Sequence, residues 1–320
     1  MIQVERIKPI PLKKEDAVEY AKKAVFEQMG DNASSVKYLG GGSFGMAFGV
    51  EFENKDQIVV KFLRANDMLD KEVFDLKLLC DSSPIKFPKV LFKRKADDII
   101  PVDCYAMEKI VGGSAFMSYL SRLLMSKRKK RDFADKVTTA LHEIHTHTSD
   151  RFGDTLNPDC DSWLDYYKPF AQAVMDKAEE MLKANELSEK IVDVMRDAWN
   201  KFDLIFSEEV KEACLIHGDL NLANIMVDGN FQISGFIDPL NSAYADREYD
   251  LFQFDNLMGK CFSLRKIYIN KYGASKNCDA KCAFYGLWNE VYCYIKSGEY
   301  VGFIMNPLVK NMKKQLKYLD

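Results

Sequence analysis

The sequence of 320 residues lacks any apolar run that approaches the roughly 18 residues required by a membrane-spanning helix. We therefore expect a protein that does not cross a membrane. An excess of charge of one sign is also absent, because 45 Lys and Arg residues nearly balance 48 Asp and Glu residues. This balance disfavours nucleic acid as a partner, although it leaves room for one basic cleft.

Metal-binding patterns of cysteine and histidine are missing as well. The 8 cysteines are scattered, and the spacing of Cys278, Cys282 and Cys293 is not that of a zinc finger or ribbon. In "LHEIHTHT", His142 and His145 miss the metalloprotease pattern by one residue, so we interpret them as structural. The opening residues lack the regions of a signal peptide, and with single cysteines this predicts a reducing, cytoplasmic environment.

The sequence does contain a clear change of pattern along its length. A helical segment, "KKEDAVEYAKKAVFEQM", precedes strand-like segments with a turn at Asn54-Lys55-Asp56. A helix at "DKEVFDLKLLCDS" and two strands in "PIKFPKVLFKRKADDIIPVDCYAMEKI" follow. After Gly113 the pattern is mostly helical, interrupted by "LIHGDLNLANIMVDGNFQISGFIDP". We predict an α+β fold with a small antiparallel β-rich lobe, residues 1–110, and a larger, mainly helical lobe, residues 111–320.

The segment "GGGSFG" is a glycine-rich loop with Gly40, Gly42 and Gly45, and Ser43 lies within it. The next residues, "MAFGVEFE", alternate with a period of two and predict a strand, whereas a dinucleotide fingerprint needs a helix there. The Gly-Lys-Ser/Thr of a Walker loop is absent. We interpret the loop as a hairpin whose backbone N–H groups cover nucleotide phosphates; the alternative is a hairpin with no ligand.

The next strand, "QIVVKFL", places Lys61 among apolar residues, where a charge is unfavourable unless it meets an opposite charge or a ligand. Glu72 shares a helical face with Leu76 and Leu79 and should point inward. An ion pair between Lys61 and Glu72 relieves both costs. We therefore predict this pair, with Lys61 also reaching nucleotide phosphates; the alternative is that both side chains turn outward.

The segment around Asp219 contains the residues with the clearest chemical role. Asp228-Gly229-Asn230 is a strong hairpin turn signal between two short strands. A hairpin would bring Asn224 and Asp238 to one edge, with Asp219 just upstream. Carboxylate and amide oxygens suit Mg²⁺, so we predict Asn224 and Asp238 as metal ligands on ATP. Asp219 is then left to accept the proton of an attacking hydroxyl.

These residues also carry a resemblance to a known family. "HGDLNLAN" resembles the HGDxxxxN catalytic loop of the aminoglycoside phosphotransferase and choline kinase-like branch of the protein-kinase-like superfamily, and "GFIDPLNSAYADREYDL" resembles its metal-binding segment. The resemblance implies a bilobal protein-kinase-like fold. It also implies Asp219 as catalytic base, Asn224 and Asp238 as magnesium ligands, and Lys61 paired with Glu72.

The same resemblance extends to other segments. "YAMEKIVGG" is similar to the hinge of these kinases, which implies that the backbone of Glu108 to Ile110 contacts adenine. "RFGDTLNPDCDSWLDYYKPF" is similar to a region of fructosamine kinase-type members. No Ala-Pro-Glu-like motif follows Asp238, which disfavours protein substrates.

We therefore expect an ATP- and Mg²⁺-dependent phosphotransferase whose partner is a small-molecule hydroxyl acceptor: a sugar, aminoglycoside, ketosamine or amino alcohol. The alternatives are a nucleotide-binding pseudoenzyme that acts as a scaffold, and a protein kinase. Asp246, Arg247, Glu248 and Asp250 open a predicted helix, where acidic residues favour the N-terminus. We expect Asp250 to cap this helix or to brace the catalytic loop.

Overall fold

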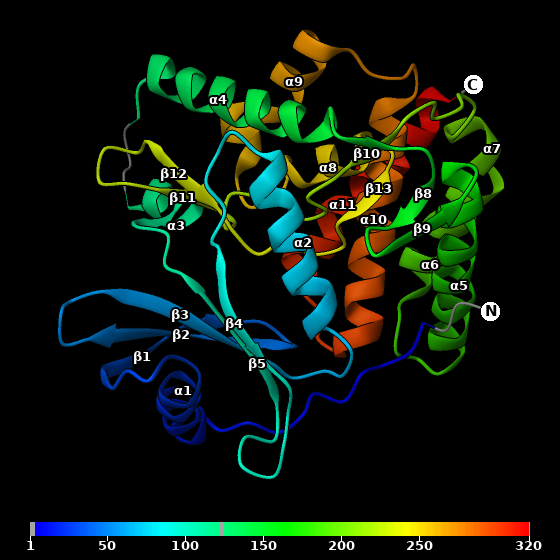
Figure 1. Cartoon of the computed structure of the whole chain (residues 1–320). Helices are drawn as coiled ribbons and strands as arrows, with labels where there is room; N and C mark the ends of the chain where they lie inside the picture. Colours follow the sequence, from blue (N-terminus) through cyan, green and yellow to red (C-terminus); the bar gives the residue numbers. More distant parts are fainter. Residues whose placement is uncertain (1–3, 122–124, 320) are drawn as a thin grey trace. The chain divides into compact units, whose positions relative to one another are not determined.

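The computed structural model describes residues 4–121 and 125–319, and these form two compact units (Figure 1). The first, called here the sheet unit, comprises Ile7–Gly113 and Ile225–Pro239. The second, the helical unit, comprises the described residues of Met1–Arg6, Ser114–Asn224 and Leu240–Asp320.

The sheet unit contains an antiparallel sheet of five strands in the order β1-β2-β3-β5-β4. The turn predicted at Asn54-Lys55-Asp56 is present, and Lys55 adopts the left-handed φ of 72° that such a turn needs. The predicted helices and strands of this part are confirmed. Their bounds are α1 (Lys14–Met29), β1 (Ala33–Gly41), β2 (Gly45–Phe52), β3 (Gln57–Leu63), α2 (Leu69–Ser82), β4 (Val90–Arg94) and β5 (Asp103–Glu108).

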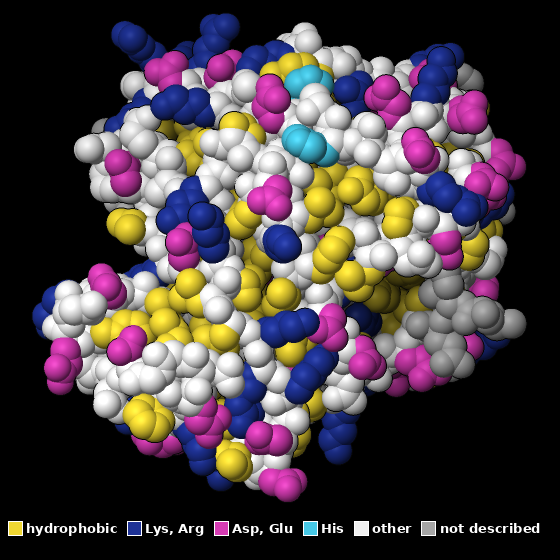
Figure 2. All heavy atoms as spheres, viewed as in Figure 1, with side chains coloured by type: hydrophobic (Ala, Val, Ile, Leu, Met, Phe, Trp, Pro, Cys, Tyr) yellow, Lys and Arg dark blue, Asp and Glu magenta, His cyan; other side chains and the backbone are white. Residues whose placement is uncertain are grey.

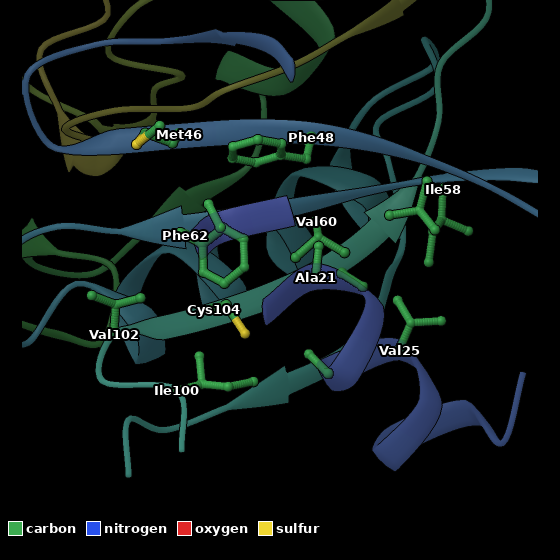
Figure 3. Close-up of a cluster of buried hydrophobic side chains, with 14 of the residues drawn as sticks. Ala21, Val25, Met46, Phe48, Ile58, Val60, Phe62, Ile100, Val102 and Cys104 are labelled. Carbon is green, nitrogen blue, oxygen red and sulfur yellow. The ribbon is translucent and has the colours of Figure 1, made fainter. Parts of the chain in front are cut away.

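The core of the sheet unit lies between α1 and the sheet. Small residues of α1 recur every three or four positions, so that one face of the helix packs closely on the strands. Figure 3 shows Ala21 and Val25 of α1 in the cluster that contains Val60 and Phe62 of β3. Because Val60 and Phe62 are fully buried, the position of Lys61 between them is fixed.

The predicted hairpin of the chemically rich segment is also present. Strand β11 (Ile225–Val227) pairs with β12 (Ile233–Phe236), and Ile225 lies opposite Phe236. The carboxylate of Asp228 accepts hydrogen bonds of 2.8 Å from the backbone N–H groups of Asn230 and Gln232, which closes the turn. Strand β6 (Gly113–Ser114) is the third strand of this small sheet.

The helical unit contains most of the helices of the chain. Its helices are α3 (Ala115–Leu120), α4 (Lys127–His145), α5 (Trp163–Lys183), α6 (Glu189–Asn200), α7 (Phe202–Ile205), α8 (Glu248–Gln253), η1 (Gly259–Phe262), α9 (Leu264–Tyr272), α10 (Cys278–Ser297), α11 (Gly302–Gln315) and η2 (Leu316–Tyr318).

The helical unit also contains a second sheet. The short strand that "CLI" before His217 predicts is present (Ala213–Leu215), but the other four strands of this sheet were not predicted. A sheet in the order β7-β10-β13-β8-β9 is formed by β7 (Thr148–Ser149), β8 (Phe152–Asp154), β9 (Asn157–Cys160), β10 (Ala213–Leu215) and β13 (Ala243–Ala245). The expectation that the chain after Gly113 is helical outside the one interruption was therefore wrong. Strands of two to four residues are too short to show a period of two.

None of the helices within the described residues is long and apolar enough to span a membrane. On the face shown in Figure 2, basic and acidic side chains are interspersed instead of being gathered by sign. The near balance of charge in the whole sequence thus holds on this face too.

Candidate active site

The glycine-rich loop joins the first two strands of the sheet unit. Gly40 lies in β1, Gly42 and Ser43 form the turn, and Gly45 begins β2. The backbone N–H of Gly42 donates to the carbonyl oxygen of Gly45 over 3.1 Å. The loop is therefore a closed hairpin turn that continues as a strand, as the alternating pattern after it predicts.

Two glycines of this loop lie close to other atoms, and at Gly41 the approach excludes a side chain. A Cβ on Gly41 would lie 2.5 Å from the carbonyl oxygen of Gly45, which no larger residue could tolerate. A Cβ on Gly45 would lie 3.0 Å from Cε of Lys61. Gly45 thus leaves room for the end of the Lys61 side chain beside the loop.

The predicted ion pair between Lys61 and Glu72 is present in the sheet unit. Nζ of Lys61 lies 2.9 Å from Oε2 of Glu72, and both side chains are largely buried. Glu72 points inward from α2 together with Leu76 and Leu79, as their spacing predicts. The hydroxyl of Tyr105 on β5 donates to Oε2 of Glu72 over 3.0 Å, which satisfies the carboxylate further.

Lys61 has a second acidic partner that the sequence did not indicate. Its Nζ lies 2.6 Å from Oδ1 of Asp238, whose side chain is half exposed. Burial by itself lowers the pKa of Lys61, but Asp238, Tyr105 and Glu72 together raise that pKa well above its ordinary value. The ammonium group is therefore fully charged at neutral pH. Asp238 itself has a left-handed φ of 56°, an uncommon backbone conformation that is concentrated at functional sites.

The hairpin reaches this position because β12 is held within the sheet unit. The backbone N–H of Phe236 donates to the carbonyl oxygen of Lys86 over 2.9 Å. A Cβ on Gly235 would lie 2.8 Å from that same oxygen and 2.8 Å from Cγ2 of Ile110. Only glycine therefore allows this packing, which fixes the strand that leads to Asp238.

The predicted hinge residues lie at the end of β5 and directly after it. Ile110 is buried against Gly235, and Glu108 is the last residue of β5. The carboxylate of Glu108 lies 2.9 Å from Nζ of Lys86, and the hydrogen bond from Lys86 is the main cause of its lowered pKa. The backbone N–H of Glu108 donates to the carbonyl of Lys89. This N–H group is thus engaged within the sheet unit.

In the helical unit, Asp219 and Asn224 are in direct contact. The side-chain amide of Asn224 donates to the carbonyl oxygen of Asp219 over 2.8 Å and to its Oδ2 over 2.9 Å. The amide of Asn221, which the sequence reasoning did not single out, donates to Oδ1 over 2.8 Å. Both asparagines are buried, so the two carboxylate oxygens of Asp219 are held by fixed donors.

Asn224 also has an oxygen that suits a metal ion. Its amide nitrogen is directed to Asp219, and its Oδ1 accepts no hydrogen bond from the described residues. Asp238 supplies carboxylate oxygens. Within the described residues no group of three or more His, Cys, Asp and Glu side chains could hold a metal.

The backbone before Asp219 is held by Asp250. The N–H groups of His217 and Gly218 donate to the two oxygens of Asp250 over 2.8 Å and 2.7 Å. Asp250 is completely buried. Gly218 has a φ of 79°, and a Cβ there would lie 2.1 Å from the carbonyl oxygen of Leu240. The expectation that Asp250 braces the catalytic loop is therefore confirmed, and the glycine in "HGD" has a steric cause.

Two of the three histidines of "LHEIHTHT", His142 and His145, have structural surroundings, as predicted. The ring nitrogens of His145 lie 3.1 Å from Oδ2 of Asp250 and 2.7 Å from the hydroxyl of Tyr268. The ring of His142 stacks on Tyr272 with centroids 3.7 Å apart. His145 thus supports the residue that holds the catalytic loop.

A further carboxylate of the helical unit was missed by the sequence reasoning. Glu290, in the middle of α10, is half buried, and burial raises its pKa to about 7. Burial, and to a smaller extent Glu290 and Asp219, raise the pKa of the Cys293 thiol to about 12. The helical periodicity of α10 gave no sign of this, because Glu290 reads as a solvated residue.

We expect Glu290→Gln to stabilise the protein at pH 8 and to leave it nearly unchanged at pH 4.5. Because the folded-state pKa is above the ordinary value of 4.5, the stability linked to the protonated side chain is lost as pH rises through about 7. The gain should be roughly 1–2 kcal/mol, since the residue is partly exposed. Urea unfolding at both pH values measures it, with Glu180→Gln as the exposed control. An equal gain at both pH values would contradict the assignment.

Comparison with known proteins shows the family and the fold. Residues 57–276, more than half of the chain, match the phosphotransferase enzyme family. No curated protein matches the chain.

Among solved structures, a candidate fructosamine-3-kinase from Thermobifida fusca is 18% identical, covers 94% of this chain and 99% of its own, and has a TM-score of 0.64. The GDP complex of aminoglycoside 2'-phosphotransferase-IIIa is 14% identical, with 94% and 99% covered and a TM-score of 0.64. A thermostable mutant of aminoglycoside phosphotransferase APH(4)-Ia, in complex with AMP-PNP and hygromycin B, is 15% identical, with 93% and 97% covered and a TM-score of 0.65. These similarities confirm the predicted protein-kinase-like fold.

Proposed function

The chain belongs to the phosphotransferase enzyme family and is a small-molecule phosphotransferase, and we propose that it transfers a phosphoryl group from ATP to a hydroxyl group with the help of Mg²⁺. The acceptor is a sugar, aminoglycoside, ketosamine or amino alcohol. The carboxylate of Asp219, held by the buried amides of Asn221 and Asn224, is the observation that carries the proposal. The complexes of similar proteins with GDP and AMP-PNP support a nucleotide as donor.

The sheet unit supplies the groups that bind the nucleotide. Lys61 carries a permanent charge beside the glycine-rich loop, and Glu72 keeps it oriented. In the proposal, Lys61 and the backbone N–H groups of residues 40–45 hold the phosphates, and the hinge at residues 108–110 holds adenine. Phosphate oxygens would share the Lys61 ammonium with Asp238, its present partner.

Asn224 and Asp238 are the residues that would hold Mg²⁺. Their oxygens fit this ion, since Mg²⁺ prefers hard oxygen ligands and retains waters. When bound, Mg²⁺ would neutralise part of the negative charge on the phosphates.

Asp219 acts on the acceptor in this proposal. Its carboxylate accepts a hydrogen bond from the acceptor hydroxyl and takes the proton as the hydroxyl oxygen forms a bond to the γ-phosphorus. The bond from that phosphorus to the bridging oxygen breaks, and ADP leaves with the electron pair. The two asparagine amides restrict the rotation of the carboxylate, so the base is oriented before the acceptor binds.

An acceptor panel tests the proposal. Purified protein with Mg²⁺-ATP is assayed for ADP release with sugars, ketosamines, aminoglycosides, choline and homoserine, each against a reaction without acceptor. We expect turnover that depends on one of these classes and on Mg²⁺. ATP binding without turnover on any hydroxyl compound would favour the scaffold alternative, and phosphate transfer only to proteins would favour the protein kinase alternative.

Lys61→Met should weaken ATP binding by about 10- to 100-fold. Hydrogen bonds to charged groups contribute about 1.5–3 kcal/mol, and each 1.4 kcal/mol is tenfold in affinity. Isothermal titration calorimetry at a temperature where the variant is folded measures the effect. The control is Lys93→Met on β4, which removes an exposed lysine paired with Asp70. Unchanged ATP affinity in Lys61→Met would remove Lys61 from the nucleotide site.

We assign nucleotide binding to residues 1–110, and catalysis and acceptor binding to residues 111–320. Asp238 lies on the segment Ile225–Pro239, which the structure groups with the sheet unit. We also propose a reducing cytosolic environment, because all 8 cysteines are free thiols.

A further inference from the structure

The helical unit contains a buried cluster of three charged side chains, Lys281, Asp246 and Glu248. Nζ of Lys281, on α10, lies 2.5 Å from Oδ2 of Asp246 and 2.9 Å from Oε2 of Glu248. Each of the three residues is at most 4% exposed. Lysine is almost never buried to this extent unless it is paired with acidic side chains. The buried position of Lys281 therefore depends on its ion pairs with Asp246 and Glu248.

The two carboxylates of the cluster are fully engaged by fixed donors. Asp246 accepts a hydrogen bond of 2.8 Å from the hydroxyl of Tyr285 and one of 3.0 Å from the N–H of Glu248. Glu248 accepts from the N–H of Ser275 over 2.5 Å and from its hydroxyl over 2.7 Å. Lys281 thus joins two carboxylates that are themselves anchored, which makes the cluster rigid.

Helix α8 connects this cluster to the catalytic loop. Glu248 is the first residue of α8 and Asp250 the third. At 3.6 residues per turn these side chains are rotated by roughly 200° from one another, so they leave the helix on opposite sides. Glu248 meets Lys281 on α10, and Asp250 accepts the N–H groups of His217 and Gly218. The orientation of α8 therefore sets the position of the backbone that carries Asp219.

We propose that Lys281 is a positioning residue for phosphoryl transfer: it fixes the start of α8 through Asp246 and Glu248, and through Asp250 the loop that holds Asp219. The catalytic consequence rests on the proposed role of Asp219. The structural consequence does not, since it concerns only the hydrogen bonds from His217 and Gly218 to Asp250. A helix of six residues has little stability of its own, so α8 depends on such anchors.

The first test is hydrogen exchange of individual backbone amides in Lys281→Met, which needs no acceptor. We expect the protection of the His217 and Gly218 amides to fall by about tenfold or more, with the amide of Val192 on α6 little changed. Ile295→Ala, a buried change on the same helix outside the cluster, is the matched control and should not expose the two loop amides selectively. Unchanged protection at His217 and Gly218 in folded Lys281→Met would overturn the proposal.

The second test is kinetic and uses an acceptor found in the panel. A displaced catalytic group lowers kcat by about 10- to 100-fold. KM for ATP should change much less, because Lys61, the glycine-rich loop and the hinge all lie in the sheet unit. Lys281→Arg keeps the charge and should restore most of the activity. A change in KM with unchanged kcat would contradict a positioning role. If Asp219 proves to have no role in catalysis, the hydrogen exchange of the His217 and Gly218 amides still decides whether Lys281 holds the loop.

The Met variant leaves two carboxylates buried without a cation, and it is a strong candidate for unfolding. In that case the combined variant Lys281→Met, Asp246→Asn, Glu248→Gln provides the test, because it buries no charge. We expect it to fold and to show the same selective loss of protection at His217 and Gly218. Wild-type protection of both amides in this variant would overturn the proposal.

Discussion

Asp219→Asn should lower the acceptor-dependent turnover by about 10²-fold or more and leave the affinity for ATP unchanged. The asparagine amide cannot take the proton of the attacking hydroxyl, and general base catalysis contributes typically 10²–10⁴-fold. The substitution is nearly isosteric. The carbonyl oxygen of residue 219 would still accept the hydrogen bond from Asn224, so the loop should keep its conformation.

Steady-state kinetics and calorimetry with ATP measure the two effects separately. The control is Asp161→Asn, since the Asp161 side chain is exposed and pairs only at the surface with Arg151. It should have no effect on turnover. Full turnover in Asp219→Asn would exclude Asp219 as the base, and lost ATP affinity would indicate a nucleotide role instead.

Asp250→Ala should lower the free energy of unfolding by about 3–5 kcal/mol. The completely buried carboxylate accepts the N–H groups of His217 and Gly218 and contacts His145. Alanine would leave these three polar groups without their partner, and each buried unsatisfied group costs about 1–3 kcal/mol. Asp250→Asn keeps one acceptor oxygen and should lose less.

Urea unfolding followed by circular dichroism measures this loss. Asp203→Ala provides the matched control, because its exposed carboxylate pairs with the partly exposed Lys168 and the change should stay within about 0.5 kcal/mol. A loss below about 1 kcal/mol in Asp250→Ala would mean that the loop is held by other contacts.

The contacts that could be predicted from the sequence are those with a local signal. The ion pair of Lys61 with Glu72 follows from a lysine among apolar strand residues and a glutamate on an apolar helical face. The hairpin that ends near Asp238 follows from Asp-Gly-Asn between two strands. In both cases residues close together in the sequence indicate which side chains are buried.

Other features depend on residues that are far apart in the sequence. The contact of Lys61 with Asp238 joins residues 177 positions apart, and no periodicity in either segment marks it. Lys281 appears as an ordinary surface lysine of a helix until α8 packs on α10. The hydrogen bond from the amide of Asn221 to Asp219 was not predicted, because the HGDxxxxN motif specifies Asn224 and leaves position 221 open. Tertiary packing decides such pairings, and local propensity cannot.

We propose that this protein transfers phosphate from ATP to a small-molecule hydroxyl with Asp219 as the base. Mass spectrometry of the panel compounds after incubation with Mg²⁺-ATP tests it most directly, with wild type and Asp219→Asn side by side. We predict one phosphate added to a hydroxyl group of one compound class by the wild type, and almost none by the variant. ADP formation without any phosphorylated small molecule would exclude this transfer, and equal product from both proteins would exclude Asp219 as the base.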